Sequence, residues 1–155
     1  MSDAGRLART CYLKVRLEWL TSSGRLRTDA RLHTGSPLCV LPYALWHDNN
    51  LPWQLLGHEL LTLGGRPRPE ALQWRGAPCY FGETQVRLVD EGNNVSRSLR
   101  IIAKLVTKPL STSWEGIILL GYNFLLDNSL IVNLNPRTRQ NTGNVNNVVG
   151  FLTVP

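Results

Sequence analysis

Residues 30–36 of this 155-residue chain read Ala-Arg-Leu-His-Thr-Gly-Ser and are the most informative part of the sequence. Before it, residues 12–20 alternate between apolar and polar side chains, which predicts a half-buried strand. Residues 21–24, Thr-Ser-Ser-Gly, are typical of a turn, and residues 25–32 predict a second strand. The chain therefore begins with a β-hairpin, whose second strand is ended by Gly35 and the proline that follows Ser36.

The rest of the sequence predicts a mostly β domain with one or two short helices. A second hairpin is expected over residues 71–89, with its tip near Gly76-Ala77-Pro78. Residues 38–41 form a short apolar run. Further strands are expected at residues 99–106, 116–121, 130–134 and 148–154, and short helices at 42–46 and 122–128. We predict a flexible N-terminus over residues 1–10, one domain over residues 11–155, and a mobile Asn-rich loop at 135–147.

Composition indicates a folded protein with an excess of positive charge. The net charge is +6, and only three of the 17 basic residues are lysine. The arginines are spread along the chain, and Arg16, Arg25, Arg27 and Arg31 fall at outward strand positions, which favours a dispersed solvated surface over a nucleic-acid footprint. Tryptophan could stack on bases, but core packing is the expected role of Trp19, Trp46, Trp53, Trp74 and Trp114.

Location and cofactors follow from what the sequence lacks. No apolar run reaches the roughly 18–20 residues of a membrane helix, and no apolar signal region follows Met1, so a cytoplasmic location is expected. The three cysteines, Cys11, Cys39 and Cys79, have no metal-type spacing and are expected as reduced, buried thiols. His47 and His58 are expected at the surface. No cofactor or metal site is predicted.

The order of four motifs resembles the retropepsin-like aspartic peptidases, which are single-domain enzymes of retroviruses with homologues in bacteria. The first is the hairpin that runs into residues 32–36 and then Val-Leu-Pro at 40–42. The second is the later hairpin with Gly76 and Gly82, where the family has its flap. The third is Ile-Leu-Leu-Gly at 118–121, a strand that crosses behind the active-site loop. The fourth is the short helix and strand at 124–132. The resemblance covers residues 11–134.

This resemblance implies an all-β acid-protease barrel that acts as a two-fold homodimer, with one active-site loop from each chain. It assigns the catalytic loop to His33, Thr34, Gly35 and Ser36, and the structural motif to Leu119, Leu120 and Gly121. An extended peptide or protein substrate would be covered by Trp74, Gly76, Ala77, Pro78, Cys79 and Gly82. Residues 148–155 would supply a strand at the dimer interface.

The chain departs from the family's pattern at the catalytic position, and this determines whether it can hydrolyse peptides. The family's mechanism uses two carboxyl groups about 3 Å apart that share one proton, and His33 stands where each chain would supply its aspartate. Asp29 lies four residues upstream, roughly 13 Å along a strand, and cannot substitute. We therefore expect an inactive or impaired peptidase that retains a peptide-binding cleft, whether the histidine is natural or introduced.

Several alternatives remain open at this point. His33 can be a residue tolerated at a dead site, a ligand contact, or half of a metal-binding pair, although no third metal ligand is nearby. The chain can instead be a non-enzymatic domain that binds protein or nucleic acid. It can also be an unrelated small β-barrel with accidental motif matches.

Overall fold

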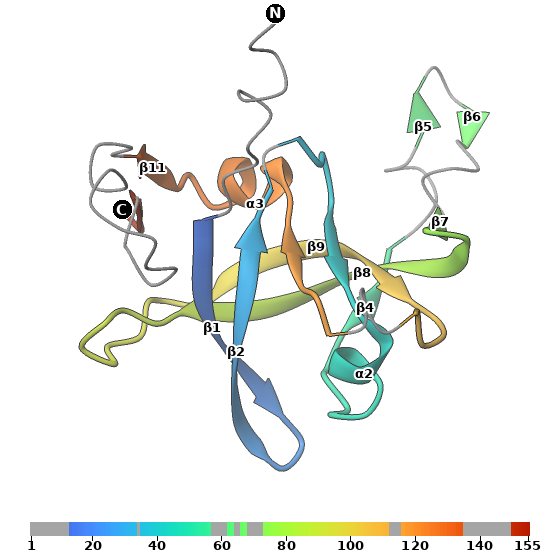
Figure 1. Ribbon diagram of the computed structural model, residues 1–155, viewed down its shortest axis with the longest axis horizontal. Helices are drawn as coiled ribbons and strands as arrows, with labels where there is room; N and C mark the ends of the chain where they lie inside the picture. Colours follow the sequence, from blue (N-terminus) through green and yellow to red (C-terminus); the bar gives the residue numbers. More distant parts are fainter. Residues whose placement is uncertain are drawn as a thin grey trace, which may run out of the picture.

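The computed structural model describes residues 13–33, 35–56, 62–63, 66–67, 73–111, 116–134 and 150–155. The fold is mainly β, a closed six-stranded mixed barrel with two short helices (Figure 1). The predicted flexible N-terminus and the predicted loop at 135–147 lie outside the described residues, as do Cys11, Thr34, His58 and Trp114. Among the helices of the described part, none is long and apolar enough to cross a membrane.

The first hairpin matches the prediction from the sequence. Strand β1 (Leu13–Thr21) pairs antiparallel with β2 (Gly24–Leu32), and Gly24 closes the turn with a φ of 127° that favours glycine. The alternate side chains of β1 point into the barrel, where Trp19 is fully buried. Its indole Nε1 donates a 2.8 Å hydrogen bond to Oγ1 of Thr28, so the one polar atom of this large side chain is satisfied.

Four more strands close the barrel: β3 (Cys39–Leu41), β8 (Ala77–Leu88), β9 (Leu99–Val106) and β10 (Leu119–Leu120). The strand order is β1-β2-β10-β3-β9-β8, and β8 returns to pair with β1. Strand β10 is parallel to β2 and antiparallel to β3, and β3 is parallel to β9. The long β8–β9 hairpin crosses the β1–β2 hairpin in Figure 1. The larger of two apolar clusters in the described residues, which includes Leu17, Trp19 and Phe124, fills the space between them.

The two helices are the predicted ones. Helix α2 (Tyr43–Trp46) begins one residue later than expected, because Pro42 is its extended N-cap residue and not its first helical residue. Helix α3 (Tyr122–Asp127) ends at Asn128, which is 5% exposed. The Asn128 side chain accepts a hydrogen bond from the Arg100 N–H (2.9 Å) and donates to the Arg100 carbonyl (2.7 Å), which fixes α3 against β9.

Short strands complete the structure. Strand β4 (Gln54–Leu55) pairs with the edge of β8, and β5 (Thr62–Leu63) pairs with β6 (Arg66–Pro67). Strand β7 (Gln73–Trp74) pairs with the start of β8. The turn between them is Arg75-Gly76, with φ values of 49° and 79°, so the predicted second hairpin is present with its tip one residue earlier than expected. At the C-terminus, β12 (Gly150–Thr153) pairs antiparallel with β11 (Ile131–Leu134) of the same chain.

Candidate functional site

The loop between β2 and β3 is held by backbone and side-chain hydrogen bonds. The His33 N–H donates to the Leu120 carbonyl at 2.9 Å, and the Ser36 N–H donates to the His33 carbonyl at 3.1 Å. The Ser36 hydroxyl donates to the Leu38 carbonyl at 2.7 Å. The Tyr122 N–H, at the start of α3, donates to the Ser36 carbonyl at 2.7 Å. The loop is therefore tied to both β10 and α3, and His33 is its first residue after β2.

Gly121 explains how β10 lies so close behind this loop. A Cβ atom built on Gly121 would lie 2.4 Å from the carbonyl carbon and oxygen of Leu38, and 2.8 Å from the Ser36 carbonyl oxygen. These are backbone atoms, which cannot rotate away. Only glycine therefore allows residues 118–121 to cross behind residues 36–38. Leu119 and Leu120, the other two motif residues, are buried in strand β10.

His33 itself is half-buried and carries an unpaired polar atom. Its Nδ1 is buried and has no hydrogen-bond partner in the described part of the chain. The imidazole lies over Gly35, where an added Cβ would be 3.0 Å from its Cε1 atom. Asp29 forms an ion pair with Lys14 at 3.1 Å and both side chains are more than half exposed, so this carboxylate belongs to the outer surface. Within the described ranges, no group of three or more His, Cys, Asp or Glu residues is placed to hold a metal ion.

A small apolar cluster connects this loop region with the second hairpin. It contains the buried residues Val40, Ala77, Val106 and Leu119, against which Trp74, Cys79, Leu110 and Ile117 pack with partial exposure. Val40 and Leu119 are directly paired across β3 and β10, beside the loop. Trp74, Ala77 and Cys79 come from the β7–β8 hairpin. The hairpin and the strand behind the loop therefore share one apolar wall.

The residues predicted to bind substrate divide into two groups. Gly76 and Pro78 are exposed, and Trp74 and Cys79 are half-buried, so all four have some surface exposed to solvent. Ala77 is fully buried. A Cβ on Gly82 would lie 2.8 Å from Trp53 and 2.9 Å from Leu105. Because of this close packing, Ala77 and Gly82 serve the fold of the hairpin.

The residues predicted for the site do not include four members of the apolar wall, namely Val40, Val106, Leu110 and Ile117. The alternation of Ile117 and Leu119 within residues 116–121 is a signal that places both side chains on one face of a strand. No comparable signal exists for Leu110, which joins the cluster from the segment after β9. Of the three histidines, His47 is exposed as predicted.

The two described cysteines are free thiols, Cys39 buried and Cys79 half-buried. Burial raises the pKa of Cys39 to about 12, and burial raises the pKa of Cys79 to about 11. The Gly121 N–H donates a 3.3 Å hydrogen bond to the Cys39 sulfur, which makes this thiol part of the support behind the loop. Cys79 is only partly buried, at the apolar wall.

These shifts predict that stability falls in alkali. Both folded-state pKa values lie above the ordinary 9.0, so the thiols stabilise the fold fully below pH 9 and lose that contribution as the pH rises toward 11–12. Urea unfolding at pH 8 and pH 11 should show a larger loss for the native chain than for a Cys39→Ala/Cys79→Ala double variant. Equal losses in the two proteins would contradict the assignment.

No known family model matches this sequence, and no curated protein is significantly similar to it.

Proposed function

We propose that this protein is a retropepsin-like aspartic peptidase relative, of the bacterial homologue type, that binds extended peptides but does not hydrolyse them because His33 replaces the catalytic aspartate. The observation that carries the proposal is the insertion of β10 between β2 and β3, which places Gly121 directly behind the loop that begins at His33. A closed β barrel alone is compatible with many functions. The hydrogen-bonded loop at His33, with Gly121 behind it, is the more specific feature and favours the peptidase-like function.

The shared apolar wall supports a peptide-binding cleft. An extended peptide offers alternate side chains to one side and backbone groups along its edge. The exposed turn Arg75-Gly76 and the half-buried Trp74 and Ile117 lie at the boundary between this wall and solvent. Apolar side chains of a peptide would pack here, and the β7–β8 hairpin would cover them as a flap.

The proposed loss of activity has a direct chemical reason. In the family's mechanism one carboxylate removes a proton from water while its neighbour holds a proton for the carbonyl oxygen or the leaving amine. Two such groups require two chains, because each chain has one loop of this type. A pair of imidazoles cannot reproduce the shared-proton carboxyl pair, so water is not activated in the same way.

The proposal includes a cytoplasmic homodimer. Two-fold symmetry would bring the two His33 loops together and complete one cleft between two hairpins. The β11–β12 pair at the C-terminus has two sheet edges, and either edge would accept a strand from the second chain.

Peptide binding tests the proposed cleft without relying on catalysis. We expect the native protein to bind fluorescent apolar peptides of about eight residues, and we expect Ile117→Glu to lower the affinity by about tenfold or more, since it places a charge in the apolar wall. Val95→Glu, which adds the same charge at a partly exposed position on the β8–β9 loop, is the matched control. Affinity lost equally in both variants, or no binding by the native protein, would refute the cleft.

A non-enzymatic interaction domain is the second candidate function. It is favoured by one specific observation, the concentration of arginine side chains on the outer face of β1, β2 and β8, which is independent of the His33 loop.

A further inference from the structure

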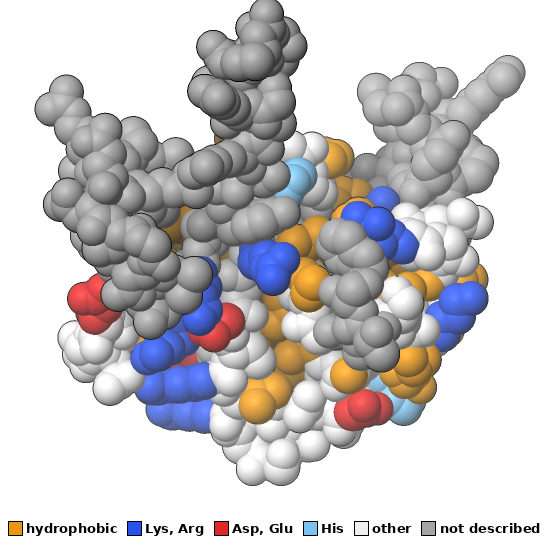
Figure 2. Space-filling model, viewed as in Figure 1, with side chains coloured by type: hydrophobic (Ala, Val, Ile, Leu, Met, Phe, Trp, Pro, Cys, Tyr) orange, Lys and Arg blue, Asp and Glu red, His pale blue; other side chains and the backbone are white. Residues whose placement is uncertain are grey.

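The outer face of the first hairpin carries a strong excess of positive charge. Alternation in the register of β1 and β2 places seven charged side chains on this face, of which five are basic and two acidic, a net charge of +3. They are Lys14, Arg16, Glu18, Arg25, Arg27, Asp29 and Arg31. Strand β8 adds Arg87, which is paired in register with Glu18. Figure 2 shows basic side chains gathered over β1 and the adjoining end of β8.

Three arginines, Arg25, Arg27 and Arg87, are neighbours of one carboxylate, that of Glu18. In register, Glu18 lies between Arg27 of β2 and Arg87 of β8. Its carboxylate is 3.1 Å from Nε of Arg27 and 3.8 Å from Nε of Arg25, and the residue is only 5% exposed. Arg16 and Arg27 both donate to the Asn93 side-chain oxygen, at 3.4 and 3.1 Å. We name Arg16, Arg25, Arg27 and Arg87 the arginine face.

The positive charge of the arginine face is not balanced within the described part of the chain. Neither Arg16 nor Arg87 forms an ion pair with any described carboxylate, and both side chains are exposed. The nearby Asp90 carboxylate accepts hydrogen bonds from the backbone and side chain of Asn94 within the β8–β9 loop, and it forms no ion pair with these arginines. The net charge at this surface is therefore available to an anionic partner.

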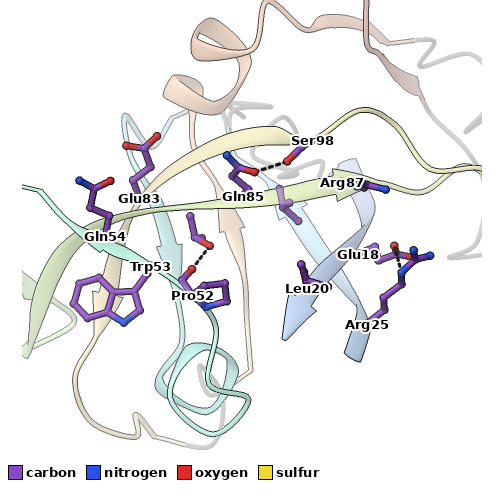
Figure 3. Close-up of a pocket in the computed structure, with 12 residues that line it drawn as sticks. Glu18, Leu20, Arg25, Pro52, Trp53, Gln54, Glu83, Gln85, Arg87 and Ser98 are labelled. Atoms are coloured by element: carbon purple, nitrogen blue, oxygen red, sulfur yellow. Dashed lines mark hydrogen bonds and ion pairs between the residues drawn. The ribbon is translucent and has the colours of Figure 1, made fainter. Parts of the chain in front are cut away.

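A groove runs from the arginine face to an aromatic side chain. The groove has a volume of about 630 Å³ and is lined by Arg25, Arg87 and Glu18 at one end and by Pro52 and Trp53 at the other. Figure 3 shows Trp53 on one side of the groove and Arg25 and Arg87 on the opposite side. Its other carboxylate, Glu83, is neutralised by a bidentate contact with Arg100. Trp53 is half-buried and stacks on Tyr80, with 5.6 Å between the ring centroids. Guanidinium groups beside a partly exposed aromatic ring are the elements of a single-strand nucleic-acid site.

We propose that this groove and the arginine face bind single-stranded nucleic acid. The guanidinium groups of Arg16, Arg25, Arg27 and Arg87 contact successive phosphates, and one base stacks against Trp53. The site is separate from the proposed peptide cleft, because Arg25 lies eight residues before His33 along β2, roughly 26 Å away. The planar fork of arginine matches phosphate and carboxylate oxygens alike, so it is the Trp53 ring, against which a base can stack, that favours a nucleic acid over an acidic peptide.

Salt dependence gives the proposal a numerical test. We expect the native protein to bind a labelled 20-residue oligo(dT), measured by fluorescence anisotropy. Four phosphate contacts on a single strand predict a slope of about −2.8 for log affinity against log salt, or roughly 50-fold weaker binding at 200 mM than at 50 mM salt. An Arg16→Gln/Arg87→Gln variant should retain a slope of about −1.4 and bind roughly 25-fold more weakly at 0.1 M salt.

The matched control is Arg75→Gln/Lys108→Gln, which removes two exposed positive charges outside the arginine face and the groove. We expect it to change the affinity less than threefold. We also expect binding to quench tryptophan fluorescence, and Trp53→Phe, which keeps an aromatic ring in place, to remove most of that quenching.

Three outcomes would overturn the proposal. One is the absence of oligo(dT) binding at 50 mM salt, and another is an equal loss of affinity in the control and test variants. The third is a 20-residue polyglutamate that binds as tightly as oligo(dT), which would assign the arginine face to an acidic peptide instead.

Discussion

Replacing His33 by aspartate is expected to raise hydrolysis of an unfolded protein substrate by roughly 10³-fold or more over the native chain, in the range from about pH 4 to 6. Aspartate is smaller than histidine, so it fits the half-buried position without new contacts. The substitution also replaces a ring whose buried Nδ1 has no hydrogen-bond partner among the described residues. In a two-fold dimer, the two new carboxyl groups would share one proton and activate a water between them.

His33→Asn is the matched control for this gain of activity. It has nearly the shape of aspartate but carries no ionisable group, so it should remain as inactive as the native protein. A statine-type inhibitor should stop hydrolysis by His33→Asp. If His33→Asp is folded, dimeric and still inert, the peptidase ancestry loses its main support and the interaction-domain function moves ahead.

Gly121→Ala is expected to destabilise the protein by about 3 kcal/mol or more, and to lower the Tm by roughly 10 °C. The added Cβ would overlap backbone atoms of Leu38 and Ser36 at 2.4 and 2.8 Å, and neither atom can move without displacing the loop. The change would be measured by urea and thermal unfolding.

Gly92→Ala is the corresponding control. The nearest atoms to a Cβ there are side-chain atoms of Asn94 and Asp90, at 3.2 and 3.4 Å, in an exposed turn. A loss below about 1 kcal/mol is expected, since surface changes of this kind are usually small. Equal stability of Gly121→Ala and the native protein would show that β10 does not press against the loop.

Local patterns were sufficient to predict the elements that alternate cleanly. The first hairpin, strand β9 and helix α3 lie where the sequence placed them, because alternation and turn residues act over a few neighbouring residues. The expected strand at 116–121 is shorter. Only Leu119–Leu120 pairs with its neighbours, and Gly116 occupies a turn with a φ of 82°.

Long-range pairing could not be derived from the sequence. Alternation correctly placed Arg16, Arg25 and Arg27 on the outside, and we expected them to be dispersed. They converge because β8 returns to β1 with Arg87 opposite Glu18, and because Asn93 reaches both Arg16 and Arg27. These contacts join residues that are 66 to 77 positions apart in the chain. The alternation of apolar and polar residues in a short segment carries no information about such contacts.

In the candidate site, too, local features could be predicted from the sequence and long-range contacts could not. The sequence pattern identified the loop at 33–36 and Gly121, whose close approach depends on the crossing of β10. It assigned Ala77 and Gly82 to substrate binding, whereas the structure buries both. The reason is that β4 and Trp53 cover Gly82, a contact between segments about 30 residues apart that the hairpin pattern does not contain.

In the proposed homodimer, two chains form one peptidase-type cleft with residue 33 of each chain at its centre. The most direct measurement is calorimetric titration of His33→Asp with a statine-type peptide inhibitor. We expect one inhibitor to bind per two chains of His33→Asp, and its affinity for His33→Asn and for the native protein to be weaker by at least roughly tenfold. One inhibitor per single chain, or equal affinity for all three proteins, would contradict this expectation.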